Sequence, residues 1–190
     1  MNFSQTFSDQ ILDHQNLFSD LASQRSDIIK AGELVIDTID QKGKILVCGN
    51  GGSASDAQHF AAELVGRFEH DRRALPAIAL TTDTSILTAV GNDYGYESVF
   101  VRQVAGLGTA SDLLIAISTS GNSKNINLAV ETAHNMGIKT VGLTGRKGGE
   151  LSKLADLPII IPHDITARIQ EVHIFVLHFW ALMVENHIIG

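Results

Sequence analysis

The sequence is short of cysteine and of long hydrophobic runs. Its 190 residues include one cysteine, Cys48, so no internal disulfide can form. Cys48 ends the apolar run that begins at Ile45, which predicts a packed strand residue rather than a reactive thiol. Every hydrophobic run is broken well short of the ~18 residues of a membrane span, and the chain opens with polar residues rather than a signal-peptide pattern. We therefore expect a cytoplasmic protein with no membrane partner.

Basic residues are also scarce. The chain has 14 Lys and Arg against 21 Asp and Glu, which gives a formal net charge of −7 and a pI near 5.5. A protein that binds nucleic acid needs a dense Lys/Arg surface, and the basic cluster here consists of Arg67, Arg72 and Arg73. We therefore expect no nucleic-acid partner. An anionic ligand would have to be held locally, by helix N-termini and backbone amides.

A length of 190 residues with 44% apolar composition favours one domain, residues 1–190, over two. Two amphipathic helical patterns occupy residues 1–42, before the first strand. Aromatic residues so near a terminus would be costly to expose, which predicts that these helices pack on another subunit. The two stripes consist of Phe3, Phe7, Ile11, His14 and Phe18, and of Ile28, Ala31, Val35 and Ile39.

From residue 43 to residue 190 the pattern changes to short β-branched runs, each followed by a polar turn and a helical stretch. This alternation predicts an α/β fold with a doubly wound parallel sheet of five strands flanked by helices. The last segment, Thr166–His187, has no internal Gly or Pro and predicts one long helix. Ligands of such sheets bind outside the carboxyl ends of the strands. The predicted strands are Lys44–Cys48, Ala77–Thr81, Asp112–Ser118, Lys139–Leu143 and Leu157–Ile161.

A glycine-rich turn, residues 49–56, follows the first strand and leads into a helix. Glycines let the backbone approach a ligand and the helix start adds partial positive charge, so the turn predicts an anion site. The turn lacks the lysine of a P-loop, which argues against nucleotide hydrolysis. It also matches the dinucleotide pattern G-x-G-x-x-A through Gly49, Gly51 and Ala54, as in an NAD oxidoreductase. That alternative is disfavoured because the acid ending the second strand, Asp83, comes about 30 residues later instead of about 20.

Hydroxyl side chains crowd the turn after the third strand, Ser118–Ser123, directly before the helical stretch Lys124–Asn135. Four hydroxyls in six residues predict a phosphate site, since one serine would be enough to cap a helix. Elsewhere, Gly91–Gly95 predicts a turn that interrupts a helical region. Its Asn92 and Asp93 would either pair with the hydroxyls of a polyol or cap the next helix.

Two helices carry groups suited to acid–base or metal chemistry. His59 and Glu63 stand at i and i+4 with a rise of about 6 Å, so their side chains share one face of the helix. They would be either two ligands of one metal or a solvated helix contact. Glu63 would also serve as a general base. On the final helix, Gln170 and His178 lie about 12 Å apart in rise, so a common metal would require side chains that lean together or a site shared between subunits. Spacing alone favours Gln170 with His173. A buried core histidine is the plain alternative.

Five motifs, in this order, closely resemble those of the bacterial phosphoheptose isomerases, members of the sugar isomerase (SIS) domain family. The resemblance covers nearly the whole chain, and the combination is far more specific than any single motif. The motifs are Cys48–Ser53, Gln58–Leu64, Gly91–Asp93, Ile117–Ser123 and Ala167–His173.

The resemblance implies the SIS fold and the conversion of sedoheptulose 7-phosphate to D-glycero-D-manno-heptose 7-phosphate, which leads to ADP-heptose and lipopolysaccharide core. It implies a homotetramer with sites at subunit boundaries, an enediol mechanism, and a core at residues 43–190 that binds the sugar phosphate. It makes Glu63 and His178 the acid/base pair, and so selects His178 over His173. The implied ligands of one Zn²⁺ per subunit are His59, Glu63, Gln170 and His178. The implied substrate contacts are Asn50, Gly51, Gly52, Ser53, Glu63, Asn92, Asp93, Ser118, Thr119, Ser120, Ser123 and Gln170.

A non-catalytic alternative comes from relatives that bind the replication initiator DnaA and share the glycine and serine loops. Those relatives tend to lack the acid at the position of Glu63 and the imidazole at the position of His178. Both groups are present here, which favours the enzyme. Ala167 stands where some members of the family carry Asp, so any role of that carboxylate is absent or filled by Asp164.

Overall fold

Five parallel strands form the central sheet of the computed structural model, which describes residues 2–190. They are β1 (Ile45–Gly49), β2 (Ala77–Ala79), β3 (Leu113–Ser118), β4 (Lys139–Gly145) and β5 (Leu157–Ile161). Their order is β2-β1-β3-β4-β5, and every neighbouring pair is parallel. The predicted doubly wound parallel sheet is confirmed. In this order the winding reverses between β1 and β3, so the crevice at their carboxyl ends is the expected place for a ligand.

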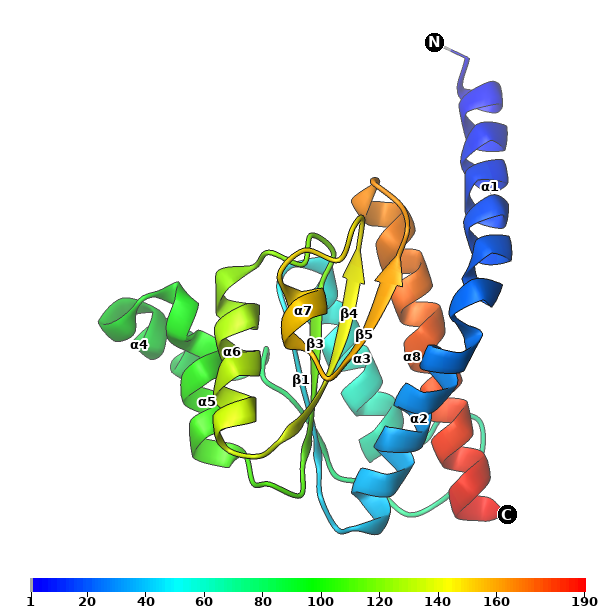
Figure 1. Cartoon of the computed structure of the whole chain (residues 1–190). Coiled ribbons are helices and arrows are strands. Elements are labelled where there is room, and N and C mark those ends of the chain that lie inside the picture. The colour runs from blue at the N-terminus through cyan, green and yellow to red at the C-terminus, as the bar shows by residue number, and fades with distance from the viewer. Residues whose placement is uncertain (1) are drawn as a thin grey trace.

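Helices cover both faces of the sheet (Figure 1). One face carries α2 (Arg25–Asp40), α3 (Gly52–Val65) and α8 (Thr166–Ile189). The opposite face carries α5 (Val99–Leu107), α6 (Lys124–Asn135) and α7 (Leu151–Leu154). The other helical elements are α1 (Phe3–Asp20), α4 (Thr84–Tyr94) and the 3-10 turns Leu21–Gln24 and Tyr96–Ser98.

Strands β1 and β3 are buried at every residue because each contributes to two cores. Along β1, Ile45 and Val47 pack with α2, α3 and α8, whereas Leu46 and Cys48 pack with α5 and α6. Successive side chains of a strand point to opposite faces, so a strand between two helix layers is apolar throughout. Burial raises the pKa of the Cys48 thiol to about 12. Cys48 is therefore an inert packed residue, as predicted.

Helix α8 is long and apolar enough, by length and composition alone, to cross a membrane. Single polar residues such as His173 and His178 interrupt this segment, so it contains no long unbroken hydrophobic run. Within the domain, α8 packs on α2, α3 and β4. Trp180 is fully buried there and donates its Nε1–H to the carbonyl oxygen of Ile28 at 2.8 Å. These contacts are those of a core helix.

Helix α1 projects beyond the sheet at its N-terminal end (Figure 1). Its C-terminal half is tied to α8: His14 Nδ1 lies 2.8 Å from Glu171 Oε2, and the rings of Phe18 and Phe175 meet edge to face. Its N-terminal half exposes large apolar side chains, with Phe3 75% accessible. Packing of residues 1–42 on another subunit stays a prediction, and this exposed apolar surface supports it.

Several element boundaries differ from the predicted ones. Strand β2 ends at Ala79 rather than Thr81, because the chain turns and Thr82 Oγ1 donates back to the Ala79 carbonyl at 3.3 Å. Strand β4 continues to Gly145, since Thr144 pairs with both neighbouring strands and Gly145 pairs with Ile161 of β5. The turn predicted at Gly91–Gly95 is wrong in extent: residues 91–94 form the last turn of α4, which ends where Gly95 adopts a φ of +85°.

Candidate active site

The glycine-rich turn between β1 and α3 lies at one side of the crevice between β1 and β3. Gly51 has a φ of +57°, which favours glycine, and stands at the N-cap position of α3. Gly52 begins the helix directly against the side-chain amide of Gln170, because a Cβ on Gly52 would lie 2.8 Å from Gln170 Cδ. Ser53 is buried behind the turn. The turn therefore brings the start of α3 into contact with the side-chain amide of Gln170.

The hydroxyl-rich turn between β3 and α6 forms the other side of the crevice. Ser123 stands at the N-cap position of α6, yet its hydroxyl bonds Ser118 Oγ at 3.0 Å and makes no cap with the helix. Capping therefore does not explain why Ser123 is a serine. Thr119 and Ser120 are half-buried at the surface of this turn. The turn is fixed from behind because Gly121 accepts a hydrogen bond from the Leu151 amide at 2.8 Å.

A pair of amides joins the two turns. Asn50 Nδ2 donates to Asn125 Oδ1 at 2.9 Å, and Asn125 Nδ2 donates to Asn50 Oδ1 at 3.0 Å. The hydroxyl of Tyr96 also donates to Asn50 Oδ1, at 3.1 Å. Sequence reasoning missed Asn125, although it lies two residues beyond Ser123 on the same helix. Asn125 is buried, and its amide pair with Asn50 links the two turns.

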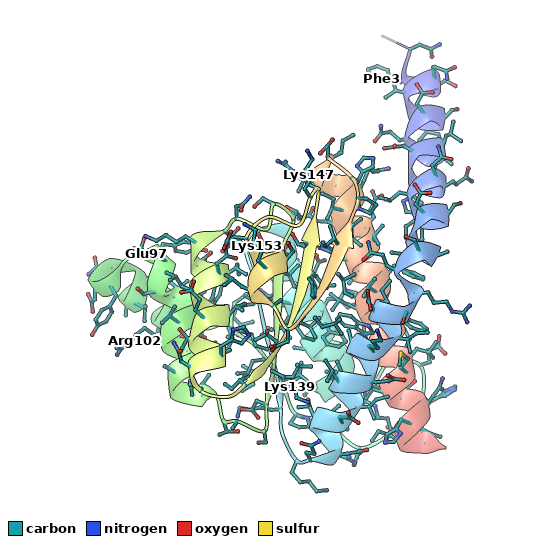
Figure 2. All side chains as sticks on the ribbon, viewed as in Figure 1. Phe3, Glu97, Arg102, Lys139, Lys147 and Lys153 are labelled. Atoms are coloured by element: carbon teal, nitrogen blue, oxygen red, sulfur yellow. The ribbon has the colours of Figure 1, made fainter. Side chains whose placement is uncertain are left out.

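Two labelled lysines mark the two ends of the sheet, whereas the polyol-binding candidates lie on a separate helix. Figure 2 shows Lys147 at the carboxyl edge of the sheet and Lys139 at the opposite edge. Asn92 and Asp93, by contrast, are exposed at the end of α4, where Asn92 Nδ2 donates to Asp93 Oδ1 at 2.8 Å. Figure 1 shows α4 on the α5 and α6 side of the sheet, away from α3 and α8. A single chain therefore does not bring Asn92 and Asp93 to the histidines of α3 and α8.

Three titratable side chains meet where α3 packs on α8. His59 Nε2 lies 2.9 Å from Glu63 Oε1, and His178 Nε2 lies 3.1 Å from His59 Nε2. One ligand atom from each residue falls within 4.8 Å of the other two. His59 and Glu63 are thus more than a helix-surface pair, because an imidazole from a distant helix joins them. Two nitrogens and one carboxylate oxygen form a donor set that suits a divalent transition metal.

The electrostatic setting favours a neutral imidazole at His178. Partial burial lowers its pKa, the neighbouring His59 lowers it further, and Glu63 opposes this trend. A neutral ring can take a proton at one nitrogen or donate one from the other. His178 is therefore suited both to proton transfer and to metal binding.

Two other polar side chains of α8 point elsewhere. His173 is completely buried, with Nε2 3.1 Å from the carbonyl oxygen of Thr144, and burial lowers its pKa to about 4. The pairing of Gln170 with His173 that spacing favours is therefore wrong, and His173 is a core histidine. Gln170 lies against Gly52 in the crevice, separated from His178 by about 12 Å of helix rise.

Comparison with known proteins relates this geometry to a family. The profile described as SIS domain matches residues 11–145. A relative named phosphoheptose isomerase from Akkermansia muciniphila is 54% identical over 187 residues, covering 98% of this chain and 99% of the relative. This chain belongs to the phosphoheptose isomerases of the SIS-domain family. A phosphoheptose isomerase from Aliarcobacter butzleri is 50% identical over 180 residues, covering 94% of this chain and 95% of the relative.

Solved structures of phosphoheptose isomerases share the whole fold. The structure from Neisseria gonorrhoeae has a TM-score of 0.93 at 42% identity and covers 97% of this chain and all of that one. The structure from Francisella tularensis has a TM-score of 0.94 at 38% identity, over 98% of this chain and all of that one. The SIS fold expected from the sequence is confirmed.

In this phosphoheptose isomerase, sequence reasoning missed two residues that adjoin the histidine cluster. The ring of Phe68 lies 5.6 Å from the ring of His178, centroid to centroid. Arg72 Nη2 donates to the carbonyl oxygen of Glu63 at 2.6 Å. The sequence pattern presents Arg72 only as part of a basic cluster. Its function as a backbone clamp depends on a fold in which α3 ends beside α8.

Proposed function

We propose that the protein is an aldose–ketose isomerase that interconverts sedoheptulose 7-phosphate and D-glycero-D-manno-heptose 7-phosphate. The observation that carries this proposal is the meeting of Glu63 and His178 where α3 packs on α8, in a chain that belongs to the phosphoheptose isomerases. A carboxylate and a neutral imidazole are the two groups that such an isomerisation needs. Their presence also disfavours the non-catalytic DnaA-binding alternative.

The crevice between the two turns would bind the phosphate. Backbone amides at the start of α3 and hydroxyls at the start of α6 are suitable donors for an anion. The reacting carbons of the substrate lie at the other end of the sugar, which would place the chemistry away from the phosphate. The proposed phosphate-end contacts are Asn50, Gly51, Gly52, Ser53, Ser118, Thr119, Ser120 and Ser123, and the proposed sugar contacts are Glu63, Asn92, Asp93 and Gln170.

The proton transfers need two positioned groups. Starting from the ketose, Glu63 removes a proton from C1 while the carbonyl oxygen on C2 gains a proton from His178, and an enediol forms. The carboxyl of Glu63 then returns a proton to C2 while the hydroxyl on C1 gives its proton to His178, which yields the aldehyde at C1. Each group ends in its starting state, so the cycle needs no external acid or base.

A metal ion fits the same cluster. His59, Glu63 and His178 present suitable donors, and we assign Gln170 as a fourth ligand of one Zn²⁺ per subunit. A bound Zn²⁺ would polarise the carbonyl and stabilise negative charge on the substrate oxygens. Gln170 lies about 12 Å of helix rise from His178 in one chain and packs against Gly52, so we assign its participation to a second copy, consistent with a homotetramer whose sites lie at subunit boundaries. Elemental analysis and light scattering of the purified protein test these two assignments.

The decisive test is proton NMR of sedoheptulose 7-phosphate with the protein in D₂O. Wild type should produce the aldose, whereas Glu63→Gln and His178→Ala should not do so at a comparable rate. Glu131→Gln, an exposed acid on α6, is the matched control and should retain activity. Failure of the wild type to form any aldose would disprove the proposed function. The cytoplasmic location and the lipopolysaccharide pathway stay predictions.

A further inference from the structure

A carboxylate without access to solvent lies near the end of α8. Glu185 is 0% accessible. Its Oε1 accepts hydrogen bonds from the amides of Glu69 and His70, both at 2.8 Å, and its Oε2 accepts one from the amide of Phe68 at 3.1 Å. Burial acts to raise the pKa of Glu185, but these amides and Arg72 outweigh it and hold the pKa below its usual value. A buried charge is costly unless it is bonded in this way.

The segment that Glu185 holds, residues 66–73, connects the end of α3 to the chain leading into β2. Within this segment the Arg72 side chain is almost inaccessible, and its Nε lies 3.8 Å from Glu185 Oε2. Its Nη2 donates to the carbonyl of Glu63, and its Nη1 donates to the carbonyl of Leu64 at 2.7 Å. Carbonyls in the last turn of a helix lack partners within the helix, and a guanidinium is well suited to supply them. Arg72 therefore fixes the backbone of α3 at Glu63.

The same segment also reaches His178. Glu185 and His178 are seven residues apart, so they share one face of α8 about 10 Å apart in rise. The segment spans this distance: the Phe68 amide bonds Glu185, and the Phe68 ring packs on the imidazole of His178 with an interplanar angle of 35°. One buried carboxylate thus orders a loop that touches both members of the proposed acid/base pair.

We propose that Glu185 is a positioning residue, which holds His178 through Phe68 and the backbone of Glu63 through Arg72. This inference rests on the proposed function for its kinetic consequence, but not for its structural one. The partly exposed imidazole of His178 has one hydrogen-bond partner among the described residues, His59, and the Phe68 ring restricts its rotation. Misplacing a reacting group by about 1 Å can cost on the order of 100-fold in rate.

The test compares two buried carboxylates that accept backbone amides. Glu185→Gln keeps one acceptor oxygen but places an NH₂ group opposite the Phe68 amide. The matched control is Asp112→Asn: Asp112 is 4% accessible, lies directly before β3, and accepts from the amides of Lys44 and Thr109 at 2.8 and 2.7 Å. Both variants should lose stability. Only Glu185→Gln should lower kcat, on the order of 10- to 100-fold, with KM within about twofold of wild type.

A second measurement does not depend on activity. The Hε1 proton of His178, assigned by its absence in His178→Ala, should shift in Glu185→Gln and in Phe68→Leu, because both variants move or remove the aromatic ring beside it. It should not shift in Asp112→Asn. Phe68→Leu leaves the Glu185 carboxylate intact and decides the question if Glu185→Gln does not fold.

Two results would overturn the proposal. One is a kcat and a His178 signal that stay at wild-type values in Phe68→Leu. The second result is that Glu185→Gln lowers kcat by no more than Asp112→Asn does and leaves the NMR signal of His178 at its wild-type position. Wild-type protein without isomerase activity would contradict the proposed function instead, and the His178 signal would still decide whether Glu185 orders the imidazole.

Discussion

The two parts of the proposed site are built in different ways. The phosphate part consists of backbone amides and hydroxyls from two turns that follow adjacent strands, β1 and β3. The chemical part consists of side chains from α3 and α8, with His59 and His178 separated by 119 positions in the chain. The sheet fixes the first part directly, whereas helix packing and the segment at residues 66–73 fix the second. Substitutions in the first should therefore act on substrate binding, and substitutions in the second on the rate of the chemical step.

The largest expected effect tests the chemical part. Glu63→Gln removes the proposed carbon base while preserving the size of the side chain, so kcat should fall by about 10²- to 10⁴-fold with little change in KM. Steady-state kinetics of heptose phosphate isomerisation measure both constants. A variant that raised KM and kept kcat would contradict the division of the site, because Glu63 would then act in binding alone.

The next largest expected effect is on protein stability, and a comparison of two histidines of α8, His173 and His187, tests it. Burial lowers the pKa of His173 from 6.5 to about 4, so between these values the unfolded chain binds more protons than the folded one. The free energy of unfolding should therefore fall as the pH drops from about 6.5 to about 4, by on the order of 3 kcal/mol in all. Urea unfolding across this range measures the fall.

His173→Gln and His187→Gln separate this effect from general acid destabilisation. His187 is exposed on the same helix, where it lies 2.9 Å from Asp40 Oδ2. The pH dependence between about 6.5 and about 4 should flatten in His173→Gln and persist in His187→Gln. Equal slopes in both variants would show that His173 is not the group responsible.

The phosphate part should respond more weakly and in KM. Ser123→Ala removes a hydroxyl that bonds Ser118 and that we propose as a phosphate contact, so KM should rise about 5- to 10-fold, the equivalent of one hydrogen bond of about 1 to 1.5 kcal/mol, with kcat nearly unchanged. Thr132→Ala on the same helix is the control, since its hydroxyl donates to the Leu128 carbonyl within the helix. A fall in kcat without a rise in KM would contradict the assignment of the serine turn to substrate binding.

The same division explains what the sequence could predict. Local patterns are sufficient for the strands and for both turns, because each turn directly follows its strand. The contact of His178 with His59 depends on how α3 and α8 pack. Residue spacing along α8 favours a pairing of Gln170 with His173 instead. The resemblance to a family selected His178. Glu185 and Arg72 had no local signal, because their partners are backbone groups that only the folded chain brings near.

The smallest expected effect comes from a comparison of two glycines, Gly52 and Gly106, whose surroundings differ in the folded chain. A Cβ at Gly52 would overlap the amide of Gln170, so Gly52→Ala should destabilise the crevice and weaken substrate binding. A Cβ at Gly106, within α5, would meet nothing within 4 Å, so Gly106→Ala should raise the free energy of unfolding by about 0.5 to 1 kcal/mol through helix propensity. Thermal unfolding and KM distinguish the two. If Gly52→Ala bound substrate as well as Gly106→Ala does, the close contact of Gln170 with the glycine turn would not matter for binding, and the phosphate part would depend on the serine turn alone.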